Sequence, residues 1–191
     1  MKKVLLLLAE GFEVFEASVF IDVFGWNLEE GNQLTRLYTC ALRKEIKSSF
    51  NQRFIVDYLP GDINTDDFDA LAIPGGFEVY GFYKDAYDER FLELIRHFRA
   101  ANKPIASICV GALPLGKSGI LNGKKATTYN SEVRRAALKS YGVEVVHQPI
   151  VSEDNIITSW NPSTAMNVAF MLLEKLSTKA NADKVRGLMG F

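Results

Sequence analysis

The chain has 191 residues, of which 48% are apolar and 24% are charged, and its formal net charge is −1 at pH 7. This length and apolar content predict one folded domain over residues 1–191. A charge close to zero, without a long basic run, argues against nucleic acid as a partner, because phosphate binding needs clustered Lys and Arg.

The first apolar run, Val4–Ala9, follows a short basic start and so has the outline of a secretory signal. The run is shorter than the apolar region of a typical signal and Glu10 interrupts it, so we interpret it as a buried strand. No stretch of the chain is apolar for long enough to span a membrane, and two cysteines are too few for a disulfide framework. We therefore expect a cytoplasmic protein that does not bind membranes.

Short apolar runs bounded by turn residues alternate with longer helical patterns. The predicted strands are Lys3–Ala9, Leu37–Leu42, Phe54–Tyr58, Ala70–Ile73, Pro104–Ile108, Lys125–Thr127, Val143–Val146, Ile150–Ser152 and Ile156–Ser159. The predicted helices are Glu13–Glu30, Asp88–Ala101, Ala112–Lys117, Glu132–Tyr141, Pro162–Leu176 and a short last helix from about residue 178. This alternation predicts an α/β fold with a mostly parallel sheet and helices on both faces.

Local signals support several of these boundaries. Ser131 can cap the helix that starts at Glu132, and Asn161 followed by Pro162 suits the start of the next helix. The polar segment Glu153–Asn155 predicts the turn of a small antiparallel hairpin.

The predicted helix Glu13–Glu30 has too many apolar residues for one buried face. They are Val19, Phe20, Ile21, Val23, Phe24 and Trp26. Packing against the sheet alone would leave aromatic surface in water, which predicts a homodimer. The alternative is that the C-terminal segment covers this helix.

Cys109 stands where the predicted strand Pro104–Ile108 gives way to a helix, with Gly111 two residues later. A thiol at such a turn is expected to be exposed above the sheet edge and to face a helix N-terminus, which favours the reactive thiolate. The alternative is a buried cysteine that acts as a small apolar residue. We assign that structural role to Cys40, which lies within a strand pattern.

Two further segments follow predicted strands and are expected at the same edge of the sheet, where ligands bind in open α/β folds. Glu13 and Glu16 are three residues apart, which places both carboxyl groups on one face of an opening helix. Pro74-Gly75-Gly76 forms a turn whose N–H groups can approach a reacting oxygen closely, because no Cβ blocks them.

These segments together resemble the ThiJ/PfpI superfamily, which is related to class I glutamine amidotransferases. The resemblance rests on the order and spacing of Glu16, Pro74-Gly75-Gly76, Ala106–Gly111, Lys125–Thr128 and Thr158-Ser159. It implies a flavodoxin-like three-layer sandwich, commonly dimeric, in which Cys109 is the nucleophile on an elbow and Glu16 is its acidic neighbour. A carboxyl group beside a thiolate shares a proton with it, so Glu16 would act as an acid and base and would limit over-oxidation of the sulfur.

The chain departs from the family at the histidines that some members use as bases. Val110 follows the cysteine where peptidases of the family have His, and Tyr129 follows the Thr-Thr pair where another branch has His. The two histidines present, His97 and His147, lie in other segments and are interpreted as surface or packing residues. A Cys–His hydrolase is therefore disfavoured.

The remaining chemistry is addition of Cys109 to a small electrophile such as an α-oxoaldehyde, with the Gly76 and Val110 N–H groups holding the oxyanion. This is a glyoxalase, hydratase or amidase type of reaction. The predicted pocket residues are Phe12, Glu13, Gly75, Phe77, Tyr129 and Trp160. The alternative is a redox sensor or stress-response protein that works through oxidation of Cys109. No cofactor and no metal are expected, since neither a dinucleotide fingerprint nor metal-ligand spacing is present.

A remote alternative is a nucleotide hydrolase, because Gly111–Ser118 fits the phosphate-loop pattern G-x-x-x-x-G-K-[ST]. A phosphate loop needs its Gly-Lys-Ser to open a helix, but here Gly119 follows at once. We therefore expect a short helix that ends at Lys117.

Overall fold

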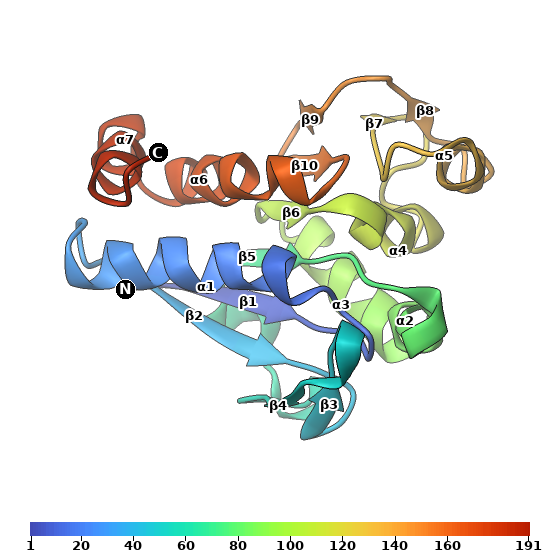
Figure 1. The fold of residues 1–191 in the computed structure, drawn as a ribbon, viewed down its shortest axis with the longest axis horizontal. Coiled ribbons are helices and arrows are strands. Elements are labelled where there is room, and N and C mark those ends of the chain that lie inside the picture. The colour runs from blue at the N-terminus through green and yellow to red at the C-terminus, as the bar shows by residue number, and fades with distance from the viewer.

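The computed structural model describes all residues 1–191 and is built on one six-stranded sheet (Figure 1). The strands run in the order β2-β1-β5-β6-β10-β9, and every pair is parallel except β10 with β9. Their bounds are β1 Lys2–Leu7, β2 Thr35–Cys40, β5 Ala70–Ile73, β6 Ile105–Ser107, β9 Ile150–Glu153 and β10 Ile156–Ser159. The predicted α/β class, the parallel sheet and the hairpin between β9 and β10 are confirmed.

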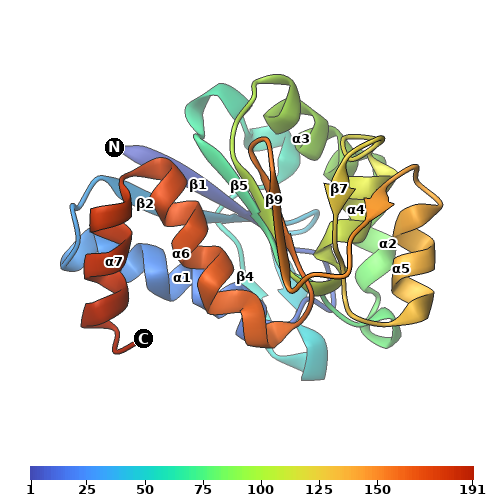
Figure 2. The ribbon, with the colours of Figure 1, turned by 90° about the horizontal axis from the view of Figure 1, so that it is seen from above.

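Helices cover both faces of this sheet (Figure 2). On one face α1 packs against α6 and α6 against α7, and on the other α3 packs against β5 and α4. The helix bounds are α1 Val14–Glu29, α2 Phe82–Ala86, α3 Glu89–Ala100, α4 Ala112–Lys117, α5 Glu132–Lys139, α6 Ala165–Leu176 and α7 Lys179–Leu188. Two small ladders lie outside the main sheet, one of β3 Glu45–Lys47 with β4 Arg53–Ile55 and one of β7 Lys125–Ala126 with β8 Glu144–Val145. No helix is long and apolar enough to cross a bilayer.

The surplus apolar surface of α1 is divided between the core and the solvent. Val19, Phe20, Val23 and Phe24 are buried, and α6 and α7 both contact this helix. Ile21 and Trp26 are each 42% exposed. The C-terminal helices thus cover part of α1 and leave three large apolar side chains in water, since Phe15 at the start of the helix is also 52% exposed.

One local prediction needs correction, and two short elements were not predicted. Asn161 does not cap α6, because residues Pro162–Thr164 form a 3-10 turn before that helix and the Asn161 side chain instead accepts a hydrogen bond from the Asn130 N–H. The short helix α2 and the strand β3 were missed, since neither has enough apolar periodicity to stand out. The Ser131 cap is confirmed, and its hydroxyl accepts from the Arg134 N–H at 3.3 Å.

The phosphate-loop pattern does not form a phosphate loop. Its Gly116-Lys117-Ser118 closes α4 instead of opening a helix, and the Lys117 ammonium lies 5.0 Å from the centre of the Tyr87 ring. A nucleotide has no helix N-terminus to bind there. The nucleotide-hydrolase alternative is therefore wrong.

Candidate active site

Cys109 lies on a strained turn at the carboxyl end of β6. Its φ of 58° is left-handed, a conformation that costs a residue with a Cβ roughly 1 to 2 kcal/mol. Hydrogen bonds on both sides hold the turn: the Cys109 carbonyl accepts from the Thr128 hydroxyl at 3.0 Å and from the Tyr129 N–H at 3.3 Å, and the Ile108 N–H donates to Ile73 at 3.1 Å. The backbone therefore fixes where the sulfur can point.

The thiol is not exposed above the sheet edge, as the sequence led us to expect. Cys109 is only 6% exposed and forms part of the wall of a cavity of about 280 Å³. The cavity is lined by Glu13, Gly76, Phe77, Glu78, Cys109, Val110, Tyr129, Arg134 and Pro162. Residues of the loops that follow β5 and β7, Gly76, Phe77 and Tyr129, share this cavity wall with the thiol.

Glu16 is fully buried beside the thiol. Its Oε2 accepts a hydrogen bond from the Gly75 N–H at 2.6 Å, and its carboxyl group is in hydrogen-bond contact with Cys109. Oε1 is buried without a hydrogen-bond partner, and Glu16 makes no ion pair. Burial, with a smaller contribution from the charge of Glu13, raises the pKa of Glu16 to about 8. Glu16 is therefore protonated at neutral pH.

The thiol shows the same effect. Burial first, and then the nearby Glu16 carboxyl group, raise the pKa of Cys109, while a hydrogen bond from the Val110 N–H opposes this rise. The prediction that position alone ionises the sulfur at neutral pH is therefore wrong, because loss of water outweighs the amide donor. The pair holds both protons at pH 7, and the form that has lost one of them appears as the pH approaches 8.

The glycine turn after β5 brings α1 and the cysteine together. Gly75 donates to Glu16 and accepts from the Glu13 N–H at 2.9 Å, so it links to α1 in both directions. A Cβ on Gly75 would lie 2.9 Å from Glu16 Oε2 and 3.0 Å from the Cys109 Cβ. Only glycine allows this approach, and because Gly75 lies behind the thiol it does not line the cavity.

The two N–H groups predicted to hold an oxyanion are available for that role. Gly76 and Val110 both line the cavity, and neither N–H donates to a backbone oxygen or to a side-chain oxygen. The Val110 N–H points to the Cys109 sulfur. A reacting oxygen next to the sulfur would find the Gly76 N–H unoccupied, and it could share the Val110 N–H with the sulfur.

Of the other predicted pocket residues, Glu13, Phe77 and Tyr129 line the cavity, whereas Phe12 and Trp160 do not. Phe12 is fully buried and packs edge-on against Phe54, with ring centres 5.0 Å apart. Trp160 packs against His147 at 4.9 Å. The prediction that both rings line the cavity is wrong, because each packs against another ring instead.

No histidine reaches the thiol. His147 and His97 are both exposed, and neither lines the cavity. This agrees with the interpretation of both as surface or packing residues, and it removes the base that a Cys–His hydrolase requires.

Sequence reasoning missed Glu78, Arg134 and Pro162, which complete the cavity wall. Arg134 extends from the first turn of α5, and its guanidinium group donates to the Glu78 carboxylate at 3.3 Å. The signal that could have indicated Glu78 and Arg134 was their closeness in sequence to residues already singled out. Glu78 lies two residues after Gly76, and Arg134 lies three residues after the predicted cap Ser131.

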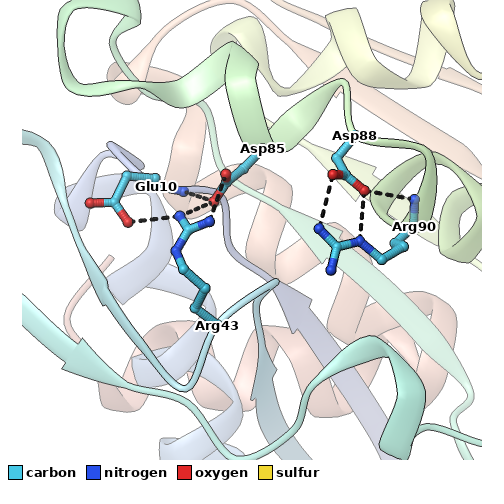
Figure 3. Close-up of polar contacts among 5 residues, drawn as sticks. All are labelled: Glu10, Arg43, Asp85, Asp88 and Arg90. Carbon is cyan, nitrogen blue, oxygen red and sulfur yellow. Dashed lines mark hydrogen bonds and ion pairs between the residues drawn. The ribbon is translucent and has the colours of Figure 1, made fainter.

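An ion pair between the buried Asp85 and the half-exposed Arg43 supports the start of the loop between β1 and α1 (Figure 3). Asp85 of α2 accepts from both Arg43 amino groups, at 3.1 and 2.6 Å, and from the Glu10 N–H at 3.0 Å. Arg43 also reaches the Glu10 carboxylate at 3.0 Å. These contacts, here called the Asp85 cluster, tie α2 and the segment after β2 to the start of the loop between β1 and α1.

The fold and this site define a class of α/β proteins with a cysteine on a strand-to-helix elbow and a buried glutamate beside it. The chain belongs to the DJ-1/PfpI family, whose family model matches residues 2–175. This agrees with the family resemblance that the sequence motifs indicated.

Individual relatives support this assignment. Protein DJ-1 homolog B of Arabidopsis thaliana is 30% identical over 187 residues, which are 97% of this chain and 41% of the plant protein. The chain therefore spans less than half of that relative. Deglycase PfpI of Pyrococcus furiosus is 30% identical over 163 residues, which cover 84% of this chain and 90% of the deglycase. The crystal structure of Drosophila melanogaster DJ-1beta superposes with a TM-score of 0.84 at 26% identity, covering 98% of this chain and 97% of the other.

Proposed function

We propose that the protein is a cysteine-dependent enzyme that converts a small α-oxoaldehyde to a 2-hydroxy acid. The observation that carries this proposal is the contact between the Cys109 thiol and the Glu16 carboxyl group at a cavity where the Gly76 and Val110 N–H groups donate to no protein oxygen. Nucleophile, acid and base, and oxyanion donors are the groups that covalent carbonyl chemistry needs. Because both cysteines are free thiols, we propose the cytoplasm as the compartment.

The reactive form is the one in which the pair has lost one proton, which becomes populated as the pH approaches 8. In the first step, the Glu16 carboxylate of this form takes the proton of the thiol while the sulfur attacks the aldehyde carbon. The C–S bond forms, and the electron pair of the carbonyl moves to the oxygen, where the Gly76 and Val110 N–H groups stabilise it. Glu16 then returns the proton to that oxygen, which gives a hemithioacetal.

In the second step, Glu16 removes the hydrogen of the former aldehyde carbon as a proton, and the electron pair forms a C=C bond while the adjacent ketone oxygen takes the hydroxyl proton of the first carbon. Glu16 returns its proton to the second carbon, and the first carbon regains its C=O bond, which leaves a thioester of a 2-hydroxy acid on Cys109. Water attacks the thioester, the C–S bond breaks and the thiol takes back its proton. One carbon is oxidised and its neighbour is reduced, so the sum is oxoaldehyde plus water and no external oxidant or cofactor enters.

Methylglyoxal is the simplest probe of this reaction. We expect the protein to consume it with formation of lactate, detectable by proton NMR, and Cys109→Ser to abolish the product. Cys40→Ala is the matched control, since Cys40 is buried in β2 away from the cavity. Equal consumption by wild type and Cys109→Ser, or consumption without a hydroxy acid, would contradict the proposal.

A second candidate is a redox sensor or stress-response protein, and the protonated state of Glu16 supports it. A carboxylic acid beside the sulfur can donate a hydrogen bond to a sulfinate oxygen and so stabilise that oxidation state. Peroxide transfers one oxygen atom at a time to the thiolate and leaves as water or alcohol. Mass spectrometry showing two added oxygen atoms on Cys109 in wild type, and further oxidation in Glu16→Gln, together with no methylglyoxal turnover, would favour this candidate over the enzyme.

A further inference from the structure

Arg134 supplies the only cationic side chain that lines the Cys109 cavity. Its guanidinium carbon lies 5.1 Å from the centre of the Tyr83 ring, and this stacking restrains the group without using its hydrogen-bond donors. One N–H contact reaches a protein oxygen, the 3.3 Å bond to Glu78. The remaining N–H groups donate to no protein atom, although the side chain is only 30% exposed.

The partner of Arg134 is loosely held. The Glu78 side chain is 68% exposed and makes no other hydrogen bond, so this ion pair is of the weak surface kind. An anion that reaches the guanidinium group can displace Glu78 into water at little cost. A planar guanidinium group with free donors fits a carboxylate well, because two parallel N–H bonds match its two oxygens.

We propose that the cavity recognises molecules that carry both an electrophilic carbon for Cys109 and a carboxylate for Arg134. This substrate class, α-oxoaldehydes with a carboxylate one or two carbons further along the chain, rests on the proposed function, whereas the anion recognition itself does not. Arg134 is then a substrate-binding residue that determines specificity.

Glu13 opposes this preference. It is half-buried at the same cavity, makes no ion pair, and its charge acts on both Glu16 and Cys109. A carboxylate near it repels an anionic ligand, so the net preference is set by the difference between Arg134 and Glu13. Removing the charge of Arg134 should therefore weaken the preference for an anionic ligand, and removing the charge of Glu13 should strengthen it.

Alkylation of Cys109 tests the recognition without any turnover. Iodoacetate and iodoacetamide both form the C–S bond with loss of iodide and differ mainly in the carboxylate. With mass spectrometry to follow Cys109, we expect Arg134→Gln to lower the iodoacetate rate about 10-fold and to change the iodoacetamide rate less than about 3-fold. Glu13→Gln should raise the ratio of the iodoacetate rate to the iodoacetamide rate.

Arg135→Gln is the matched control, because Arg135 neighbours Arg134 on α5, carries the same charge and does not line the cavity. If Arg134→Gln and Arg135→Gln give the same ratio of the iodoacetate rate to the iodoacetamide rate, long-range charge explains any change in that ratio. The proposal is then overturned. Partial recovery of the ratio in Arg134→Lys, which keeps the charge but loses the planar fork, supports it.

Turnover then tests the substrate class. The probe is 4,5-dioxopentanoate, and its methyl ester is the neutral control. We expect the acid to have a kcat/KM about 10-fold higher than the ester in wild type, with the difference in KM, and Arg134→Gln to remove it. Turnover of methylglyoxal with no preference for the acid overturns this inference and leaves the proposed function intact. A selective alkylation ratio with no turnover of any oxoaldehyde overturns the proposed function and leaves the recognition intact.

Discussion

Two carboxylic side chains are buried near the same edge of the sheet, and their surroundings differ completely. Asp85, 2% exposed, accepts three hydrogen bonds, two of them from the guanidinium group of Arg43 (Figure 3). Glu16, fully buried, accepts one N–H, touches a thiol and faces no cation. Asp85 therefore has its charge compensated, whereas Glu16 must keep a proton to remain in its site.

The comparison separates a group that holds the structure together from a group prepared for chemistry. A buried carboxylate with a matched cation stabilises the contacts between segments, and its removal leaves unpaired donors. A buried carboxyl group without one has a pKa close to the pH at which it would act, which is the condition for efficient proton transfer. The following experiments test this contrast, starting with the largest expected effect.

Glu16→Gln is expected to lower Cys109-dependent turnover of methylglyoxal by about 100-fold or more, because the amide can neither accept nor release the proton. Glutamine has the same shape and can still accept the Gly75 N–H, so the fold should be retained. Steady-state kcat/KM is the measurement, and Asp85→Asn is the control that neutralises the other buried carboxyl group. Similar losses in the two variants would show that the contrast is false.

Asp85→Ala is expected to lower the free energy of unfolding by about 2 to 3 kcal/mol, because the Glu10 N–H and the Arg43 guanidinium group lose their buried partner. Urea denaturation measures the change. Glu45→Ala removes the exposed Arg53 ion pair and should cost at most about 0.5 kcal/mol. Equal costs in the two variants would mean that the Asp85 cluster contributes no more than a surface pair.

The buried Glu16 should make the folded state less stable as the pH rises. Its folded pKa of about 8 lies above its ordinary value of 4.5, so between these pH values the folded state binds more protons than the unfolded state. Stability is then lost as the pH rises through this window. In Glu16→Gln we expect the loss between pH 5 and pH 8 to shrink by about 3 kcal/mol. If Glu16→Gln lost as much stability as wild type over this pH range, the proton responsible would not be on Glu16.

The same proton should govern the reactivity of the sulfur. We expect the rate of Cys109 alkylation by iodoacetamide to rise through an apparent pKa near 8, where the pair first loses a proton. In Glu16→Gln the midpoint should move upward, because the buried thiol then ionises without a carboxyl group to share the remaining proton. A midpoint well below 7 in wild type would contradict the burial of the pair.

The smallest effect concerns association, which is independent of the buried pair. We propose a homodimer through the exposed apolar side chains of α1, Ile21 and Trp26. Light scattering should give about twice the chain mass of 21.4 kDa for wild type and the single mass for Trp26→Glu. Glu16→Gln should leave the mass unchanged, and a monomeric wild type at micromolar concentration would refute the dimer.

The frame of the molecule could be predicted from the sequence wherever a local rule is strong. Strands β5 and β10 and helix α4 have their predicted bounds, because their buried apolar runs end at Pro, Gly or other turn residues. Cys109 and the glycine turn were found because each follows a strand at the same sheet edge, whereas the choice of Glu16 depended on the family resemblance. Parallel strands bring such segments together whatever lies between them.

Features that depend on long-range packing could not be predicted. The burial of the thiol results from loops after β5 and β7 that close over it, and burial decides the sign of its pKa shift. Phe12 and Trp160 were misplaced because a ring in a loop can pack inward or line a cavity, and the sequence does not distinguish the two. Arg134 was missed because a charged residue in an exposed helix turn has no sequence mark of a ligand site.

The left-handed backbone of Cys109 has an implication for how this position evolves and can be engineered. A glycine would adopt the same turn without strain, which would stabilise the backbone by about 1 kcal/mol before the loss of side-chain contacts is counted. Selection for thermostability alone would therefore tend to replace the cysteine. A library screened only for resistance to heat should therefore drift away from the thiol, whereas a library screened for chemistry must keep it.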